Sequence, residues 1–151
     1  MKLYFTIFFI FLILIQIVYT QNCEQSKSGK LILIIDSIKN NKGNIRIHLY
    51  NYERAKYFPK KTDNCFRLKV GNIVNGKCVV SFENLEYDTY CLSVHHDENT
   101  NESMDLTFLG LPKEGWGISN NVKLWFRLPK FDECSFKIDS DTKIINVNMR
   151  Y

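Results

Sequence analysis

Short runs in which apolar and polar residues alternate recur through most of the chain, and this period of two constrains the fold more than any other feature. Two runs, 31–36 and 45–50, flank a polar turn that ends at Gly43. The pattern returns at 78–82, 90–96, 134–138 and 145–151. Successive side chains of a strand point to opposite faces of the sheet, so each run predicts a strand with one buried face.

About seven such strands, with turn residues between them and no convincing amphipathic helix, predict an all-β fold. We expect a Greek-key β-sandwich, immunoglobulin-like or transthyretin-like, with one long loop. A small barrel is the alternative. We expect the runs 31–36 and 45–50 to pair as a hairpin. The chain has 151 residues, of which 45% are hydrophobic, enough for one core, so we expect a single β-sandwich domain over 21–151.

The first twenty residues differ from the rest of the chain. Lys2 precedes an almost wholly apolar stretch from Leu3 to Val18, and Thr20 follows shortly afterwards. This order is typical of a secretory signal peptide over 1–20, and it predicts a secreted, periplasmic or cell-surface protein. An uncleaved anchor is the alternative. The stretch is short for a span of about 20 residues, so we expect no stable membrane insertion after cleavage.

Cysteine content and charge bound the chemistry further. An exported chain with five cysteines is expected to form one or two disulfides, whose pairing the spacing leaves open. The cysteines are Cys23, Cys65, Cys78, Cys91 and Cys134. No C-x-x-C spacing occurs, which argues against a zinc ribbon or a thioredoxin-type redox site. The net charge of +4 is spread along the chain, so we expect no nucleic-acid partner.

Residues 95–121 are rich in oxygen-bearing side chains and turn glycines. Four of them stand at relative positions 1, 3, 5 and 9, the spacing that opens a calcium loop: Asp97, Asn99, Asn101 and Asp105. Glu102 replaces the usual central glycine, and Phe108 replaces the bidentate glutamate. These departures predict weak Ca²⁺ binding, of the order of 10⁻⁴ to 10⁻³ M. Asp and Asn also cap turns through their own backbone bonds, so both interpretations stay open.

Six further residues of this loop are candidates for ligand binding: His96, Glu114, Trp116, Ser119, Asn120 and Asn121. His96 precedes Asp97, whose carboxylate could orient the imidazole. His95 and His96 should face opposite sides of a strand and therefore should not share one metal ion. Trp116 lies between two glycines, which can either present the indole to a sugar or a protein or tuck it against the sandwich.

Two long motifs stand out in the second half of the chain: F-x-x-L-x-x-x-T-Y-x-x-S-V-x-H-D-E-N-x-N from Phe82 to Asn101, and F-L-G-L-P-K-E-G-W-G-I-S-N-N from Phe108 to Asn121. They resemble the secreted bacterial family known as domain of unknown function 2141. Asp88 and Ile118 depart from the family pattern, which usually has a glycine and an aromatic residue there. The resemblance implies an exported β-sandwich with a long loop, and it implies no assigned activity.

Three functions remain as hypotheses. The leading one is a secreted, non-enzymatic binding module whose polar loop, ordered by Ca²⁺ or by its own hydrogen bonds, meets a protein or glycan partner. We assign no catalytic residue, because no nucleophile and base pair is evident. The first alternative is a metal-dependent hydrolase or isomerase that uses His96, Asp97 and Glu114. The second is a purely structural or inhibitory accessory domain.

Overall fold

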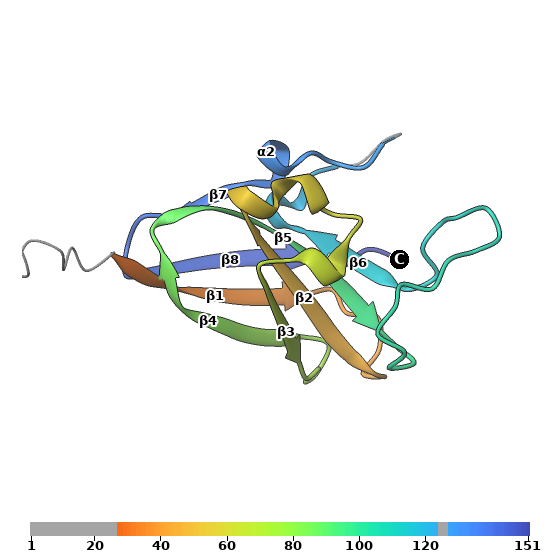
Figure 1. The fold of residues 1–151 in the computed structure, drawn as a ribbon. Helices are drawn as coiled ribbons and strands as arrows, with labels where there is room; N and C mark the ends of the chain where they lie inside the picture. Colours follow the sequence, from red (N-terminus) through yellow and green to blue (C-terminus); the bar gives the residue numbers. More distant parts are fainter. Residues whose placement is uncertain (1–26, 124–126) are drawn as a thin grey trace, which may run out of the picture.

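Two β-sheets face each other and enclose the core of the protein (Figure 1). The structure is a computed structural model that describes residues 27–123 and 127–151, so the predicted signal peptide lies outside the described residues. The first sheet has the order β4-β1-β8, formed by β1 (Ser28–Asp36), β4 (Cys78–Glu86) and β8 (Thr142–Asn148). β1 pairs antiparallel with β4 and parallel with β8, which makes it the central strand.

The second sheet is antiparallel and has the order β3-β2-β5-β6, with β7 beside the start of β5. Its strands are β2 (Asn44–Asn51), β3 (Arg67–Gly71), β5 (Asp88–Asp97), β6 (Gly115–Ile118) and β7 (Phe136–Ile138). β7 pairs with residues 88–90 of β5, and β6 pairs with residues 93–96. β5 therefore has β2 along one edge, and β7 and β6 in succession along the other.

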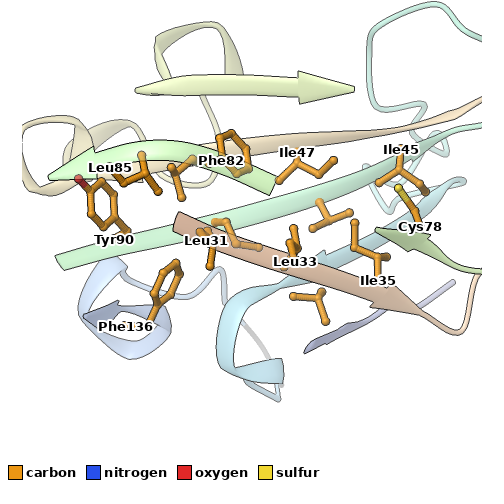
Figure 2. Packing of buried hydrophobic residues seen from close by; sticks show 14 of the residues in the cluster. Leu31, Leu33, Ile35, Ile45, Ile47, Cys78, Phe82, Leu85, Tyr90 and Phe136 are labelled. Carbon is orange, nitrogen blue, oxygen red and sulfur yellow. The ribbon is translucent and has the colours of Figure 1, made fainter. Parts of the chain in front are cut away.

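The main core fills the space between the sheets. Leu31, Leu33 and Ile35 of β1 point from the first sheet toward Ile45 and Ile47 of β2 (Figure 2). All five side chains are fully buried, as the alternation of apolar and polar residues predicts. Burial of these side chains supplies the main driving force for folding.

A second cluster covers the outer face of the β5 sheet, the face that points away from the main core. Its buried members are Tyr50, Phe58, Cys91, Ile118, Phe131 and Cys134. Phe131 and Cys134 belong to α2 (Phe131–Cys134), which packs on β5, and Phe58 directly follows η1 (Tyr52–Tyr57), which packs on β2. Two further single turns are η2 (Thr62–Asn64) and η3 (Ser119–Asn121). Part of the β5 sheet is thus buried on both faces, and Cys134 ends a helix instead of lying in the predicted strand.

The all-β prediction is confirmed, whereas the predicted hairpin of residues 31–36 and 45–50 is wrong. β1 and β2 lie in different sheets, and residues 37–43 carry the chain from one sheet to the other. Alternation reports that a strand buries one face, but it does not say whether the neighbouring strand lies beside it or opposite it. The immunoglobulin-like or transthyretin-like Greek key stays a prediction.

The structure also bears on the predicted long loop and on the predicted disulfides. The long loop is shorter than predicted: it runs over 98–114, because residues 115–118 form β6 and 119–121 form η3. The four described cysteines, Cys65, Cys78, Cys91 and Cys134, are free thiols. Within residues 27–123 and 127–151, no helix is long and apolar enough to cross a membrane.

Two matched leucine substitutions test where the core lies. Leu33 is fully buried between the sheets, whereas Leu68 on β3 is 47% exposed. We expect Leu33→Ala to lower the free energy of unfolding by about 3 kcal/mol, because it removes apolar contacts and leaves a cavity. Leu68→Ala should lower it by less than about 1 kcal/mol. Urea unfolding of both variants measures the difference, and equal losses would contradict this core.

Candidate functional site

The C-terminal end of β5 sends its polar side chains to two different sides. His95 and Asp97 are two residues apart and share the outer face, where they stand opposite Arg46 and Asn44 of β2. His96 lies between them and faces the inner side of the sheet. Both histidines are buried, at 6% exposure for His95 and 0% for His96. Outward orientation therefore does not mean exposure at this strand.

His95, Asp97 and Glu114 form a buried polar cluster, which we call the carboxylate–histidine cluster. The His95 Nε2–H donates to Glu114 Oε2 at 2.8 Å. One ligand atom from each of the three residues lies within 4.8 Å of the others. Two carboxylates and one imidazole at this separation are a set that could hold a metal ion. The structure thus groups Asp97 and Glu114 with His95, and not with His96 as the sequence suggested.

His96 instead joins a separate hydrogen-bond chain at the edge of the main core. Its Nε2–H donates to the carbonyl of Lys42 at 2.8 Å, and its Nδ1 lies 2.8 Å from the Tyr151 hydroxyl. The Tyr151 hydroxyl in turn accepts from the backbone N–H of Lys39 at 2.9 Å. His96 therefore links the β1–β2 connection to the last residue of the chain.

The two carboxylates of the cluster bind backbone N–H groups in the first half of loop 98–114. Glu114 accepts from the backbone N–H of Glu98 at 2.9 Å and of Asp105 at 3.1 Å. Asp97 accepts from the backbone N–H of Asn101 at 3.1 Å and of Glu102 at 3.0 Å. A buried carboxylate that receives several backbone N–H bonds is well satisfied and fixes the chain around it.

The four side chains with calcium-loop spacing do come together. Both oxygens of Asp105 accept from side-chain amides, from Asn99 at 2.8 Å and from Asn101 at 3.1 Å. Glu102 has a φ of 66°, the left-handed conformation for which calcium loops use glycine, and its carboxylate reaches Arg46 at 3.3 Å. These contacts match the interpretation as a hydrogen-bonded turn, and Ca²⁺ binding stays a prediction.

Of the remaining loop candidates, Trp116 is the cross-strand neighbour of His95, whereas the other three lie in η3. Trp116 is half-buried on β6, with the Arg150 guanidinium 5.3 Å from its ring centre. Ser119 is buried and donates to the carbonyl of Cys134. Asn120 donates to the Ser135 carbonyl, and Asn121 exchanges hydrogen bonds with the β8 backbone. These contacts attach β6 and η3 to neighbouring segments.

Two buried polar residues of β2 escaped the sequence analysis. Arg46 and His48 lie on the outer face, 8% and 5% exposed. Arg46 Nε and His48 Nδ1 have no hydrogen-bond partner among the described residues. Burial, together with the nearby His95 and Arg46, lowers the pKa of His48 from 6.5 to about 4. The only sequence signal was the outward parity of both residues, and outward positions of a strand are usually exposed.

The second unexpected feature is an apolar finger, residues 105–113, which projects beyond the strands (Figure 1). Its two limbs are joined by hydrogen bonds from Thr107 N to Leu111 O at 2.8 Å and from Lys113 N to Asp105 O at 2.8 Å. The exposed apolar side chains on it are Leu106, Phe108, Leu109 and Leu111. Phe108 is 96% exposed and Leu109 is 71% exposed. Large apolar side chains gathered this way on a surface mark an interaction site.

Comparison with known proteins identifies one family. A family model described as an uncharacterized protein conserved in bacteria, domain of unknown function 2141, matches residues 33–146. The chain belongs to this family. The matched range contains the carboxylate–histidine cluster and the apolar finger, so both lie within the domain that defines the family. No curated protein and no solved structure matches the chain.

Because His48 is buried, we predict that the free energy of unfolding of this family member depends on pH. The native state keeps His48 neutral down to a pKa of about 4, whereas the unfolded chain takes up a proton near 6.5. Stability from this residue is therefore complete above pH 6.5 and is lost as the pH falls toward 4. The size of the loss is about 3 kcal/mol.

His48→Gln removes the titrating group and keeps a polar side chain of similar reach. Its free energy of unfolding, measured by urea titration from pH 7.5 to 4.5, should fall less steeply than that of the wild type. Carboxylates contribute equally to both curves, so the difference between them isolates His48. Parallel curves would contradict a depressed pKa at this position.

Proposed function

We propose that this protein is an exported, non-enzymatic binding module that inserts its apolar finger into a hydrophobic pocket of a protein partner. The observation that carries the proposal is the exposure of Phe108, Leu109 and Leu111 on one ordered projection. Leaving such side chains in water forgoes about 1.5–3 kcal/mol each relative to burying them. A partner pocket would recover that free energy.

The finger is suited to act as an anchor because it is already ordered. Besides the two limb contacts, Gly110 N donates to Thr107 O at 2.9 Å and Leu111 N donates to the Thr107 hydroxyl at 3.1 Å. Gly110 has a φ of 77°, a left-handed conformation that glycine adopts without strain at the turn. A projection fixed in this way loses little conformational entropy on docking.

The carboxylate–histidine cluster contributes to this function by fixing the base of the finger. Asp105, the first residue of the finger, is attached to Glu114 through its backbone N–H, and Glu114 is attached to His95 on β5. The finger therefore starts and ends at a buried, hydrogen-bonded base. The oxygen-rich loop, on this proposal, positions the apolar tip.

A protein partner fits the tip better than a glycan. Sugar sites combine an exposed aromatic ring with free polar groups, and the Thr107 hydroxyl of the tip already accepts from Leu111 N. Trp116, the aromatic residue that could have met a sugar or a protein, is half-buried beneath Arg150. Buried aromatic and aliphatic anchors at the centre of an interface are typical of protein–protein binding.

Photo-crosslinking tests the finger directly. Phe108→benzoylphenylalanine should yield a discrete adduct in an extract of the source organism, because the ring would lie inside the partner. Val79→benzoylphenylalanine, at an exposed β4 position, is the matched control and should not yield it. Unlabelled wild-type protein should compete with the crosslinking variant and reduce formation of this adduct. Unlabelled Phe108→Ser should need at least a tenfold higher concentration to do so.

Two results would contradict a finger-specific protein partner. One is the same adduct pattern from both crosslinking positions, which would mean non-specific collision. The other is sedimentation of the wild type, but not Phe108→Ser, with neutral phosphatidylcholine vesicles in the absence of any protein adduct. That second result would make the finger a lipid-contacting tip.

A second candidate function is a metal-dependent enzyme, favoured by the convergence of His95, Asp97 and Glu114 within 4.8 Å. One imidazole and two carboxylates suit Zn²⁺ or a similar transition metal. Three protein ligands leave one position for water or substrate, as in catalytic zinc sites. In this alternative His95 takes the role that the sequence gave to His96.

The adjacent histidines provide a matched test of that alternative. If the cluster holds metal, dialysed wild-type protein and His96→Gln should each retain about one equivalent of Zn²⁺ by elemental analysis. His95→Gln should lose at least a hundredfold in Zn²⁺ affinity. Far-UV circular dichroism confirms that each variant is folded. Absence of Zn²⁺ from the wild type, or equal affinity in both variants, would exclude the metal alternative and leave the cluster as the base of the finger.

A further inference from the structure

Two cysteines from distant parts of the chain meet in the second core cluster. Cys91 lies on the outer face of β5, Cys134 ends α2, and both are fully buried. The Ser119 hydroxyl joins their surroundings: it donates to the carbonyl of Cys134 and lies 3.6 Å from the Cys91 sulfur. α2 itself packs on β5. The second cluster therefore places the two thiols in one closed environment.

The two thiols also influence each other directly. The Cys91 thiol lies within hydrogen-bonding reach of the Cys134 sulfur, which lowers the pKa of Cys134. Burial raises the pKa of Cys91, and the contact with Cys134 adds to that rise. Mutual contact of this kind requires the side chains to point toward each other.

We propose that Cys91 and Cys134 are a disulfide-forming pair that ties α2 to β5 when the chain meets a low-molecular-weight disulfide as oxidant. The other described cysteines are placed differently. Cys78 lies on β4 in the main core, and the charged neighbours of Cys65 are Asp63 and Arg54. Cys65 belongs to the rim of the second cluster, where it is only half-buried.

The exchange balances in two steps. One of the two thiolates attacks one sulfur of the oxidant, forms a mixed disulfide and releases the other half as a thiolate. The thiolate of the second cysteine then attacks the protein sulfur of the mixed disulfide, the Cys91–Cys134 disulfide forms, and the second half of the oxidant leaves. The protein loses two protons and two electrons, and the oxidant becomes two thiols. Because both sulfurs are buried in the folded protein, the first step takes place before α2 docks on β5.

A disulfide between Cys91 and Cys134 would enclose the proposed functional features in one covalent loop. The segment between Cys91 and Cys134 contains the carboxylate–histidine cluster, the apolar finger and η3. A disulfide that closes a loop of this length restricts the unfolded chain and so favours the folded state. The inference does not depend on the partner of the finger.

Refolding with oxidised glutathione tests the pair. The variant Cys23→Ala, Cys65→Ala, Cys78→Ala keeps only the two proposed partners. After oxidation and denaturation it should resist alkylation, and a proteolytic peptide joining Cys91 to Cys134 should appear about 2 Da below the sum of its reduced parts. Its melting temperature should rise by roughly 10 °C over the reduced form.

Adding Cys91→Ala to that variant gives the matched control, which should show neither the joined peptide nor the rise. In the wild type, the same joined peptide should be the main product. The proposal is overturned if Cys91 and Cys134 stay open to alkylation after oxidation, or if the wild type joins other cysteines instead. A joined peptide without a rise in melting temperature would overturn the stabilising role.

Discussion

The double burial of β5 is the constraint on which the rest of the structure depends. Its inner side chains, such as Leu92 and Val94, fill the main core, while Cys91 and His95 on its outer side are covered as well. A polar group buried on such a strand is costly unless it is hydrogen-bonded. His95 therefore needs a buried acceptor, and Glu114 supplies it at 2.8 Å. The chain before β6 is held at β5 by this requirement.

The hydrogen bond between His95 and Glu114 also explains how the apolar finger can project from the sandwich without collapsing onto it. Glu114 receives the backbone N–H of Glu98 and of Asp105, so both ends of the loop are attached to one buried carboxylate. The ordering entropy of the loop is then lost during folding, before any partner arrives. The hydrogen bonds of Glu114 at the base of the finger therefore keep Phe108, at its tip, in position as an anchor.

Much of the strand content could be predicted from the sequence, but the pairing could not. The alternation located the inner faces of β1, β2, β4 and β8, because burial of one face leaves a period of two. It could not place β1 and β2 in different sheets, since both arrangements bury the same residues. Parity also assigned His95 and His96 to opposite sides correctly. Parity could not show that Glu114 reaches His95 on the outer face, because the pairing of β6 with β5 across loop 98–114 leaves no periodic signal. The finger was missed because apolar residues such as Phe108 default to the core.

The cysteine pair and the base of the finger act on different properties of the molecule. Cys91 and His95 share the outer face of β5 but stand four residues apart, about 13 Å along the strand. Their partners also differ, since Cys91 meets α2 and His95 meets the residue before β6. Reduction of the pair would therefore loosen the attachment of α2 while the hydrogen bonds of Glu114 stay in place. The presentation of Phe108 depends on those local bonds, so the redox state should change how long the module survives more than how it binds.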